Sequence, residues 1–334
     1  MNETIYDIII VGAGPIGLAC ALQAKSQGLH VRILEKGTLV NSLYHYPATM
    51  TFFSTSERLE IGGIPFVSNH AKPARNEALE YYRRVAVSAA LDIGLFEEVI
   101  RVQKEDGTFR VQSVKDHYRA RNIVIATGFY GIPYLLNVPG EDLPKVTHYY
   151  SDPHFYALQK VVIVGASNSA VDAALETWRK GAEVTMVVRG AEIGQRVKYW
   201  VRPDIINRIE EGAIKAYFHS TVTAIHPYTV DIQTPEGPIS IPNDRVIAMT
   251  GYQPDLGFLS SLGIQLADDE IRAPVFNPDT HESNVKGIYL AGVICGGMNT
   301  HRLFIENSRE HAVQIVNHIR QKTNRAYRSG AITE

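Results

Sequence analysis

The N-terminal part of the chain alternates apolar runs with amphipathic stretches. Residues 5–11 form an almost continuous apolar run, which predicts a strand buried on both faces, as in a parallel sheet. Residues 16–27 follow with a helical pattern that ends at Gly28, and residues 30–35 predict a second strand. The first 35 residues therefore predict a β-α-β unit.

The middle of the chain is less regular. Residues 37–67 are rich in aromatic and hydroxyl side chains and show no periodicity that predicts a helix or a strand. A loop of this length inside a compact domain usually has a functional role. The pattern beyond it predicts an amphipathic helix over 76–91, strands over 97–104, 108–113 and 117–120, and an apolar strand over 122–128.

The apolar strand and glycine-rich turn then recur. A Pro- and Gly-rich stretch at 131–144 indicates a linker, and a second β-α-β unit opens at Val161. Its strand at 245–251 ends in Thr-Gly, as the strand at 122–128 does, and a strand at 287–292 and a helix at 304–321 follow. We therefore expect an α/β fold with two Rossmann-like dinucleotide-binding domains of the three-layer ββα type. The expected domains are a discontinuous FAD-binding domain at 1–140 and 254–334, and an NADPH-binding domain at 141–253.

The first glycine-rich turn has the spacing of a dinucleotide-binding fingerprint. Gly12 permits the tight turn, Gly14 permits close approach to a pyrophosphate, and Gly17 permits the helix to pack on the strand. The following helix N-terminus offers N–H groups to phosphates. Glu35 lies 23 residues after Gly12, where a carboxylate accepts hydrogen bonds from ribose hydroxyls and repels a 2′-phosphate. This pattern predicts FAD or NAD.

The second turn begins at Gly165 and differs at the matching charged position. Arg189 lies 24 residues after Gly165, where a guanidinium suits the 2′-phosphate of NADP. Arg196, Lys198 and Arg202 follow and add positive charge. Glycine-rich turns also occur in α/β proteins that bind no nucleotide, but two matches with opposite charge partners weaken that alternative.

Composition narrows the class of protein. The chain has 334 residues, 45% of them hydrophobic and 20% charged, and a formal net charge of −2, so neither a nucleic-acid surface nor a membrane surface is indicated. The predicted strand near residue 5 leaves no room for a signal peptide, and no apolar run is long enough to span a bilayer. Two cysteines, Cys20 and Cys295, exclude a disulfide scaffold, and no His/Cys/Asp/Glu spacing predicts a metal site. We expect a cytoplasmic enzyme.

Several motifs together resemble a known family. The chain resembles the thioredoxin-reductase-like flavoproteins with two dinucleotide-binding domains. The motifs that carry this resemblance are the two glycine-rich turns, Ala126-Thr127-Gly128 and the strand ending at Gly292. More narrowly, the chain resembles the YpdA family of bacillithiol disulfide reductases. The segments that carry this narrower resemblance are residues 46–62, 148–150, 168–176, 199–204, 292–297 and 304–307.

The resemblance implies two cofactors, FAD and NADPH. It implies that hydride passes from NADPH to the flavin, and that electrons pass on to a low-molecular-weight thiol disulfide of the bacillithiol type. The motifs and the resemblance together give the expected cofactor-binding residues: Gly12, Gly14, Pro15, Ile16, Gly17, Glu35, Lys36, Ser42, Tyr46, Pro47, Thr51, Phe52, Ser54, Val99, Ala126, Thr127, Gly128, Gly165, Ser167, Asn168, Ser169, Ala170, Arg189, Lys198, Gly251, Gly292, Val293 and Glu306.

The chain departs from these families at its thiols. It has no Cys-x-x-Cys pair, which excludes the dithiol relay of thioredoxin reductases proper. Ile16 occupies the position after the proline at which the YpdA family typically has a cysteine, and an aliphatic side chain cannot attack a disulfide. Val293 stands where many flavoproteins have an aspartate, in agreement with the YpdA pattern.

The candidate catalytic thiol is Cys295, because its Gly-rich turn passes close to the flavin in the family that the chain resembles, and a thiol beside a helix N-terminus can be activated. The alternative is that it plays no catalytic part, because it has no obvious partner histidine or second cysteine. Cys20 shares a helix face with Ile16 and is expected to be a small core residue. His45, His148 and His301 are candidate proton donors, none of them singled out.

Two other functions stay open. A ferredoxin- or flavodoxin-NADP reductase passes electrons to a small redox protein and needs no cysteine, so Ile16 favours it. A non-catalytic flavoprotein could instead sense the NADPH level. In either case, and for the disulfide reductase, we expect a homo-oligomer, since dimers are common among such reductases.

Overall fold

The computed structural model describes residues 4–328, and the chain divides into two compact units. Among the described residues, the first consists of 4–44, 50–132 and 253–328, and the second of 45–49 and 133–252. The expected boundary after residue 140 therefore lies inside the second unit. The segment 45–49 joins the second unit because its contacts are there: the Ala48 N–H donates to the Ser151 carbonyl at 2.8 Å.

The first unit is built on a mostly parallel sheet. Its central strand β1 (Ile5–Val11) pairs in parallel with β2 (Val31–Leu34) and β6 (His117–Ile125). Both Ile9 and Ile10 are 0% exposed, so the two faces of β1 are buried, as the apolar run predicts. The sheet has the order β3-β2-β1-β6-β5-β4, with β17 also pairing with β6. Its other strands are β3 (Ile93–Gly94), β4 (Val99–Glu105), β5 (Thr108–Ser113) and β17 (Ile288–Leu290).

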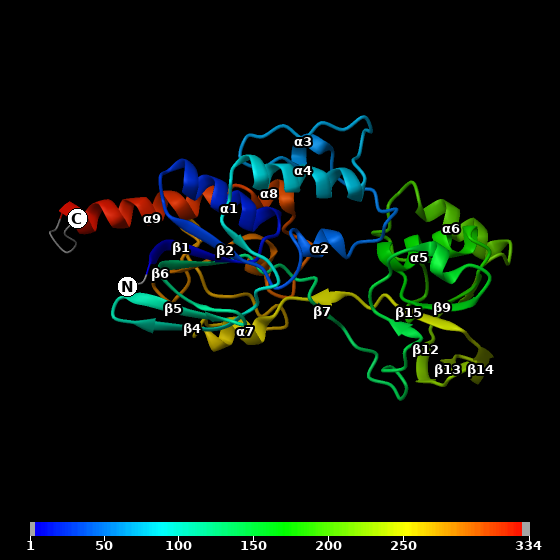
Figure 1. Cartoon of the computed structure of the whole chain (residues 1–334). Helices are drawn as coiled ribbons and strands as arrows, with labels where there is room; N and C mark the ends of the chain where they lie inside the picture. The colour runs from blue at the N-terminus through cyan, green and yellow to red at the C-terminus, as the bar shows by residue number, and fades with distance from the viewer. Residues whose placement is uncertain (1–3, 329–334) are drawn as a thin grey trace. The chain divides into compact units, whose positions relative to one another are not determined.

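Helices cover this sheet. Helix α1 (Pro15–Ser26) packs beside α9 (His311–Arg328), and Figure 1 shows both on one side of the sheet, with α7 on the other. The remaining helical elements are α2 (Asn41–Tyr44), α3 (Ser56–Leu59), α4 (Arg75–Ser88), α7 (Leu256–Ser261), the 3₁₀ turn η2 (Gly292–Gly296) and α8 (Ile305–Ser308).

Three local expectations differ from the structure. The region 37–67 contains the short helices α2 and α3, which are too brief to give a periodic pattern. The strands expected at 117–120 and 122–128 form one strand, β6. The single C-terminal helix expected at 304–321 is divided into α8 and α9, although Arg309 between them keeps helical backbone angles.

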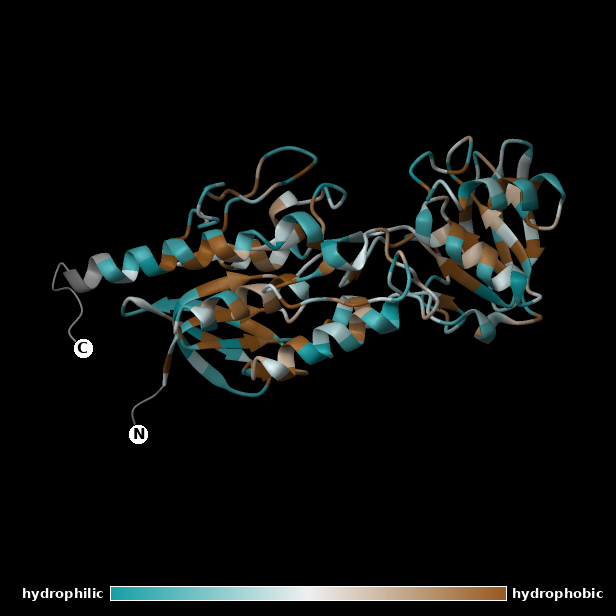
Figure 2. Ribbon diagram, turned by 90° about the horizontal axis from the view of Figure 1, so that it is seen from above, coloured by the Kyte–Doolittle hydropathy of each residue, from teal (hydrophilic) through white to brown (hydrophobic). Residues whose placement is uncertain are grey.

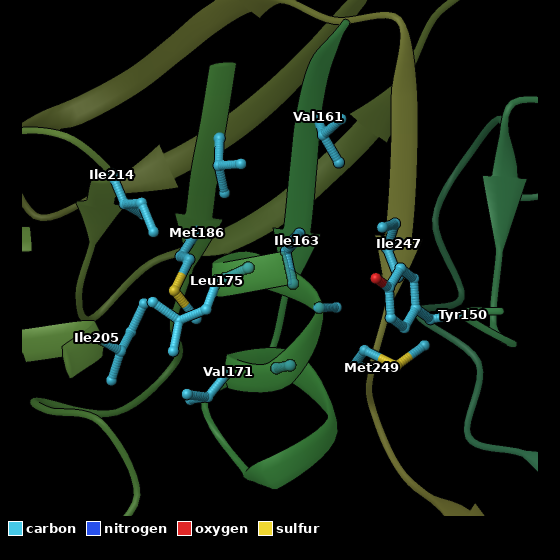
Figure 3. Close-up of a cluster of buried hydrophobic side chains, with 14 of the residues drawn as sticks. Tyr150, Val161, Ile163, Val171, Leu175, Met186, Ile205, Ile214, Ile247 and Met249 are labelled. Atoms are coloured by element: carbon cyan, nitrogen blue, oxygen red, sulfur yellow. The ribbon is translucent and has the colours of Figure 1, made fainter. Parts of the chain in front are cut away.

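The second unit contains a five-stranded parallel sheet of order β11-β10-β9-β15-β8. Figure 3 shows Val171 and Leu175 of α5 packed beside Ile163 and Met186 of this sheet, with Ile205 of α6 next to Leu175. The elements are β8 (Val146–Thr147), η1 (Pro153–Tyr156), β9 (Lys160–Val164), α5 (Asn168–Arg179), β10 (Glu183–Val187), α6 (Arg202–Glu210), β11 (Lys215–Tyr217) and β15 (Arg245–Ala248).

A separate antiparallel sheet, absent from the expectations, consists of β12 (Thr221–Ile225), β13 (Thr229–Thr234) and β14 (Gly237–Pro242). The short strands β7 (Ile132–Pro133) and β16 (Tyr252–Gln253) pair where the chain passes from one unit to the other. Figure 2 shows that hydrophobic residues concentrate on the sheet strands of each unit. No helix within residues 4–328 has both the length and the apolar character needed to span a bilayer.

Candidate cofactor-binding sites

The first glycine-rich turn joins β1 to α1 and is sterically closed to side chains. Gly12 has φ +107°, and a methyl group on it would lie 2.6 Å from the carbonyl oxygen of Ala126. A methyl group on Gly17 would overlap the carbonyl oxygen of Gly12. Gly14 is the N-cap residue of α1 and Pro15 is its first residue, so the helix begins where the fingerprint predicts. A methyl group on Gly14 would meet no atom within 4 Å, and the N-terminus of a helix is a favourable place for a phosphate group.

Glu35 is fixed immediately after β2. Its carboxylate accepts the Ala13 N–H at 2.8 Å and the Gly37 N–H at 2.9 Å, one on each oxygen. The side chain is buried, and this burial raises the pKa of the Glu35 carboxyl, while the two backbone donors oppose that shift. The carboxylate is therefore held in one orientation beside the glycine-rich turn.

A cavity of about 120 Å³ opens beside this turn in the first unit. The buried hydroxyl of Thr127 faces no hydrogen-bond partner among the described residues, which fits a ligand with polar groups. A buried carboxylate, an unpartnered hydroxyl and a glycine-rich turn together fit a ribose and its phosphates. Of the expected residues, Gly12, Glu35, Lys36, Val99, Thr127 and Gly128 line the cavity. The sequence did not single out its other lining residues, which include Phe129, Gln253, Asp255 and Phe258.

The expected residues of the long loop are spread over several places. Ser42 lies on α2, Thr51 forms a bridge with Ala74, and the buried Phe52 donates its N–H to the Pro73 carbonyl. Ser54 precedes α3, and none of these four lines the cavity. Tyr46 and Pro47 belong to the second unit, where burial raises the pKa of Tyr46 to about 12.

The second glycine-rich turn joins β9 to α5 and repeats the steric constraint of the first. Gly165 has φ +127°, and a methyl group there would lie 2.6 Å from the carbonyl oxygen of Met249. Ser167 is the N-cap residue of α5, Ser169 lies in its first turn, and the fully buried Ala170 occupies the position of the third glycine. Asn168 instead binds the loop that follows β10, because its amide oxygen accepts the Lys198 N–H at 2.8 Å.

The cations near this turn have different surroundings. Arg189 is exposed two residues after the end of β10. The Lys198 ammonium lies 2.7 Å from the Asp172 carboxylate, and its side chain is only 13% exposed. Arg189 is therefore the better placed of the two to meet an incoming phosphate, because the charge of Lys198 is already compensated. Gly251, with φ +97°, ends the segment after β15.

The Gly-rich segment after β17 packs against the first turn. Gly292 has φ +84°, and a methyl group on it would lie 3.4 Å from Ile16. Val293 is the next residue of η2. Glu306 lies on α8, 3.7 Å from Arg58, and its Oε2 atom is buried without a hydrogen bond among the described residues.

Both thiols are buried. Cys295 is 6% exposed and Cys20 is 1% exposed. Burial raises the pKa of Cys20 to about 12 and raises the pKa of Cys295 as well. A thiol, rather than the nucleophilic thiolate, is therefore the stable form of Cys295 at neutral pH, and its catalytic role stays a prediction.

The fold gathers His281, Cys295 and His311 into one buried cluster, which the sequence spacing did not predict. Their ligating atoms lie within 4.8 Å of one another. The two imidazole rings are 4.0 Å apart between centroids and inclined by 32°. Two histidines that bind one tetrahedral metal ion would have their ring centroids roughly 5 Å apart, farther than the 4.0 Å found here. The histidines are therefore arranged as a packed ring pair.

The expected proton donors are not members of this cluster. His148 Nε2 lies 3.2 Å from Glu141, and the His45 ring packs 6.1 Å from that of Tyr149, both within the second unit. His301 is exposed just before α8.

Comparison with known proteins agrees with this geometry. Residues 9–292 match the pyridine nucleotide-disulphide oxidoreductase family. Bacilliredoxin reductase Bdr of Bacillus subtilis is 42% identical over 95% of this chain and 98% of its own length. A ferredoxin–NADP reductase of Ignicoccus hospitalis is 27% identical over 86% of this chain and 90% of its own length.

Solved structures give the same result. The bacillithiol disulfide reductase Bdr (YpdA) of Staphylococcus aureus superimposes with a TM-score of 0.92 and 42% identity, covering 96% of this chain and 99% of that one. A thioredoxin reductase of Lactococcus lactis shares the fold, with a TM-score of 0.74 and 18% identity over 95% of this chain and 98% of that one. The chain belongs to the pyridine nucleotide-disulphide oxidoreductase family, and within it to the Bdr (YpdA) group.

Proposed function

We propose that this oxidoreductase uses NADPH and FAD to reduce a low-molecular-weight thiol disulfide of the bacillithiol type. The observation that carries the cofactor assignment is the pair of glycine-rich turns, which share one steric constraint but face opposite charges: the buried Glu35 and the exposed Arg189. The names of the 42% identical relatives support the acceptor class.

In the first unit, the proposed role of the described residues is to hold FAD. Gly12, Gly14 and Gly17 expose the backbone and the start of α1 to the pyrophosphate, and Glu35 accepts hydrogen bonds from ribose hydroxyls. When both cofactors are bound, they supply hydride transfer from the nicotinamide to the flavin.

In the second unit, the proposed ligand is NADPH. Gly165 and the first residues of α5 receive the pyrophosphate, and Arg189 binds the 2′-phosphate. Asn168 and Lys198 support this site indirectly, since they connect α5 to the loop that follows Arg189.

The proposed reaction balances without a thiol of this chain. Reduction of a disulfide to two thiols consumes two electrons and two protons, which the hydride of NADPH and one solvent proton provide. Ile16 cannot form a covalent intermediate, and Cys295 is buried as a thiol. The acceptor is therefore reduced without a mixed disulfide at position 16.

The deciding experiment is an acceptor screen with the FAD-loaded full chain and NADPH. Bacillithiol disulfide, a ferredoxin and a flavodoxin are each tested for sustained NADPH oxidation. Turnover with the disulfide supports the proposal. Turnover with only the redox proteins would replace it with the ferredoxin–NADP reductase alternative, which the Ignicoccus hospitalis relative favours. No turnover with any acceptor would favour a sensor. Light scattering of the same sample tests the predicted homo-oligomer.

Substitution of Cys295 tests the remaining thiol route. We expect Cys295→Ala to keep disulfide turnover within about threefold of the unmodified protein, because a protonated, buried thiol is a poor nucleophile. Loss of disulfide turnover, with NADPH reduction of the flavin intact, would restore Cys295 as the catalytic residue.

A further inference from the structure

Two buried histidines connect the start of α9 to the turn that follows β17. His311, the first residue of α9, accepts the Gly292 N–H on its Nδ1 atom at 3.1 Å. His281 lies 3.1 Å from the Leu290 carbonyl through Nδ1 and 3.0 Å from the Gln314 side-chain amide through Nε2. Both histidines are less than 9% exposed, so these contacts are shielded from water.

The hydrogen bonds determine the protonation state of His311. An Nδ1 atom that accepts a backbone N–H carries no proton, so His311 is neutral, with its proton on Nε2. Burial and the neighbouring His281 lower the pKa of His311 to about 4, in agreement with this state.

His281 is oriented by a different pair of partners. Its Nδ1 donates to the Leu290 carbonyl, and its Nε2 lies 3.0 Å from the Gln314 side-chain oxygen. Burial lowers the pKa of His281 too. His281 has φ +59°, a left-handed backbone that an ordinary residue keeps only where its surroundings impose it.

The turn held by His311 reaches the first glycine-rich turn. Gly292 lies against Ile16, and Ile16 is the second residue of α1, at the helix start proposed to receive the FAD pyrophosphate. The contact runs from His311 through Gly292 to Ile16, all within the first unit.

We propose that His311 is a positioning residue for FAD: its unprotonated Nδ1 holds Gly292 against Ile16, and the adjacent ring of His281 keeps the His311 ring in place. The inference rests on the proposed FAD site. It assigns to the start of α9 a role that does not require contact with the cofactor.

Two substitutions of His311 separate the hydrogen bond from ring packing. The Asn side-chain oxygen takes the place of Nδ1, whereas the Gln oxygen reaches toward Nε2. We expect His311→Asn to bind FAD within about threefold of the unmodified protein, and His311→Gln to bind about 10- to 100-fold more weakly, because the Gly292 N–H is left unpaired. His226→Asn, at an exposed histidine of the second unit, is the matched control.

The pH dependence of FAD binding is the second readout. The titratable groups facing His311 are His281 and the Cys295 thiol, and Cys20 acts on Cys295. We expect FAD affinity of the unmodified protein to fall as the pH is lowered from 6.5 toward 4, and His311→Asn to lose most of this dependence.

Three results would overturn the inference. The first is an FAD affinity in both variants equal to that of the unmodified protein, and the second is the same loss of FAD affinity in both variants. The third is a pH dependence of FAD binding in His311→Asn that equals that of the unmodified protein. If His311→Gln does not fold, as judged by circular dichroism, the pH profile of His311→Asn decides. An unmodified protein that binds no FAD at any pH would instead reject the proposed function itself.

Discussion

The two glycine-rich turns of this protein are alike in backbone and opposite in electrostatics. Gly12 and Gly165 both have positive φ, and at both a methyl group would lie 2.6 Å from a carbonyl oxygen at the end of a neighbouring strand. The acidic partner of the first turn, Glu35, is buried and held by two backbone N–H groups, whereas Arg189 beside the second is exposed. Under the proposed function, the glycines make a phosphate site possible at each turn, and the charged side chain selects the nucleotide.

The charged partners of the two turns also differ in how they are held. Glu35 is oriented before any ligand binds, because both its oxygens already accept hydrogen bonds. Arg189 is exposed, whereas the Lys198 ammonium is already paired with Asp172. The acidic partner of the proposed FAD site is therefore fixed in the free protein, whereas the basic partner of the proposed NADPH site is exposed and open to an incoming phosphate.

The largest expected effect is a separation of the two turns by alanine substitution. Gly12→Ala should abolish FAD binding while NADPH binding persists, and Gly165→Ala should do the reverse, each costing roughly 3 kcal/mol or more through strain and overlap with a backbone oxygen. Flavin absorbance and NADPH titration measure the two. Gly212→Ala, at an exposed positive-φ glycine with no atom near its added methyl group, controls for backbone strain alone. If Gly12→Ala and Gly165→Ala each lost the binding of both FAD and NADPH, the two turns would not form independent binding sites.

Acid should destabilise the first unit through its buried histidine. The pKa of His311 is about 4 in the folded chain and about 6.5 when unfolded, so the unfolded state binds the proton more readily. The contribution of neutral His311 to the free energy of unfolding is fully present above about pH 6.5. It decreases as the pH falls toward 4, by about 3 kcal/mol in total. Urea unfolding across this range measures the slope. His226→Asn in the second unit should leave this pH slope unchanged. If His311→Asn has the same slope as the unmodified protein, His311 is not the group responsible.

Glu35→Gln tests the acidic partner. One amide NH₂ group would then face either the Ala13 or the Gly37 N–H, which places two donors against each other and weakens FAD binding by about 2 kcal/mol. Fluorescence titration with FAD gives the affinity. Glu183→Gln, which removes an exposed ion pair with Lys215, should change it by less than about 0.5 kcal/mol. Equal changes in the two variants would remove Glu35 from the site.

Arg189→Ala should have the smallest effect and tests the basic partner of the second glycine-rich turn. It should weaken NADPH binding by about 1–2 kcal/mol and leave NADH binding nearly unchanged, because only NADPH has the 2′-phosphate. Arg179→Ala removes another exposed cation of the same unit and serves as the control. A larger NADPH-specific loss in Lys198→Met than in Arg189→Ala would move the phosphate site to Lys198.

Much of the fold followed from local patterns. The apolar run at β1, the helix starting at Pro15 and the glycine-rich turns were predictable because each depends on neighbouring residues. The helices α2 and α3 were not, because four residues are too few for a periodic signal. The sheet β12–β14 was missed as well, because its strands depend on pairing with one another.

The sequence by itself determined the two β-α-β units and the opposite charges of Glu35 and Arg189, since spacing along one strand and helix decides these. It also carried the motifs by which the chain resembles its family. Only the tertiary structure decided which charges are compensated, as with Lys198 and Asp172, and which distant residues line one cavity, as with Thr127 and Phe258. It alone brought His281 and His311 into contact. These features depend on burial and on contacts between remote segments, which no local pattern encodes.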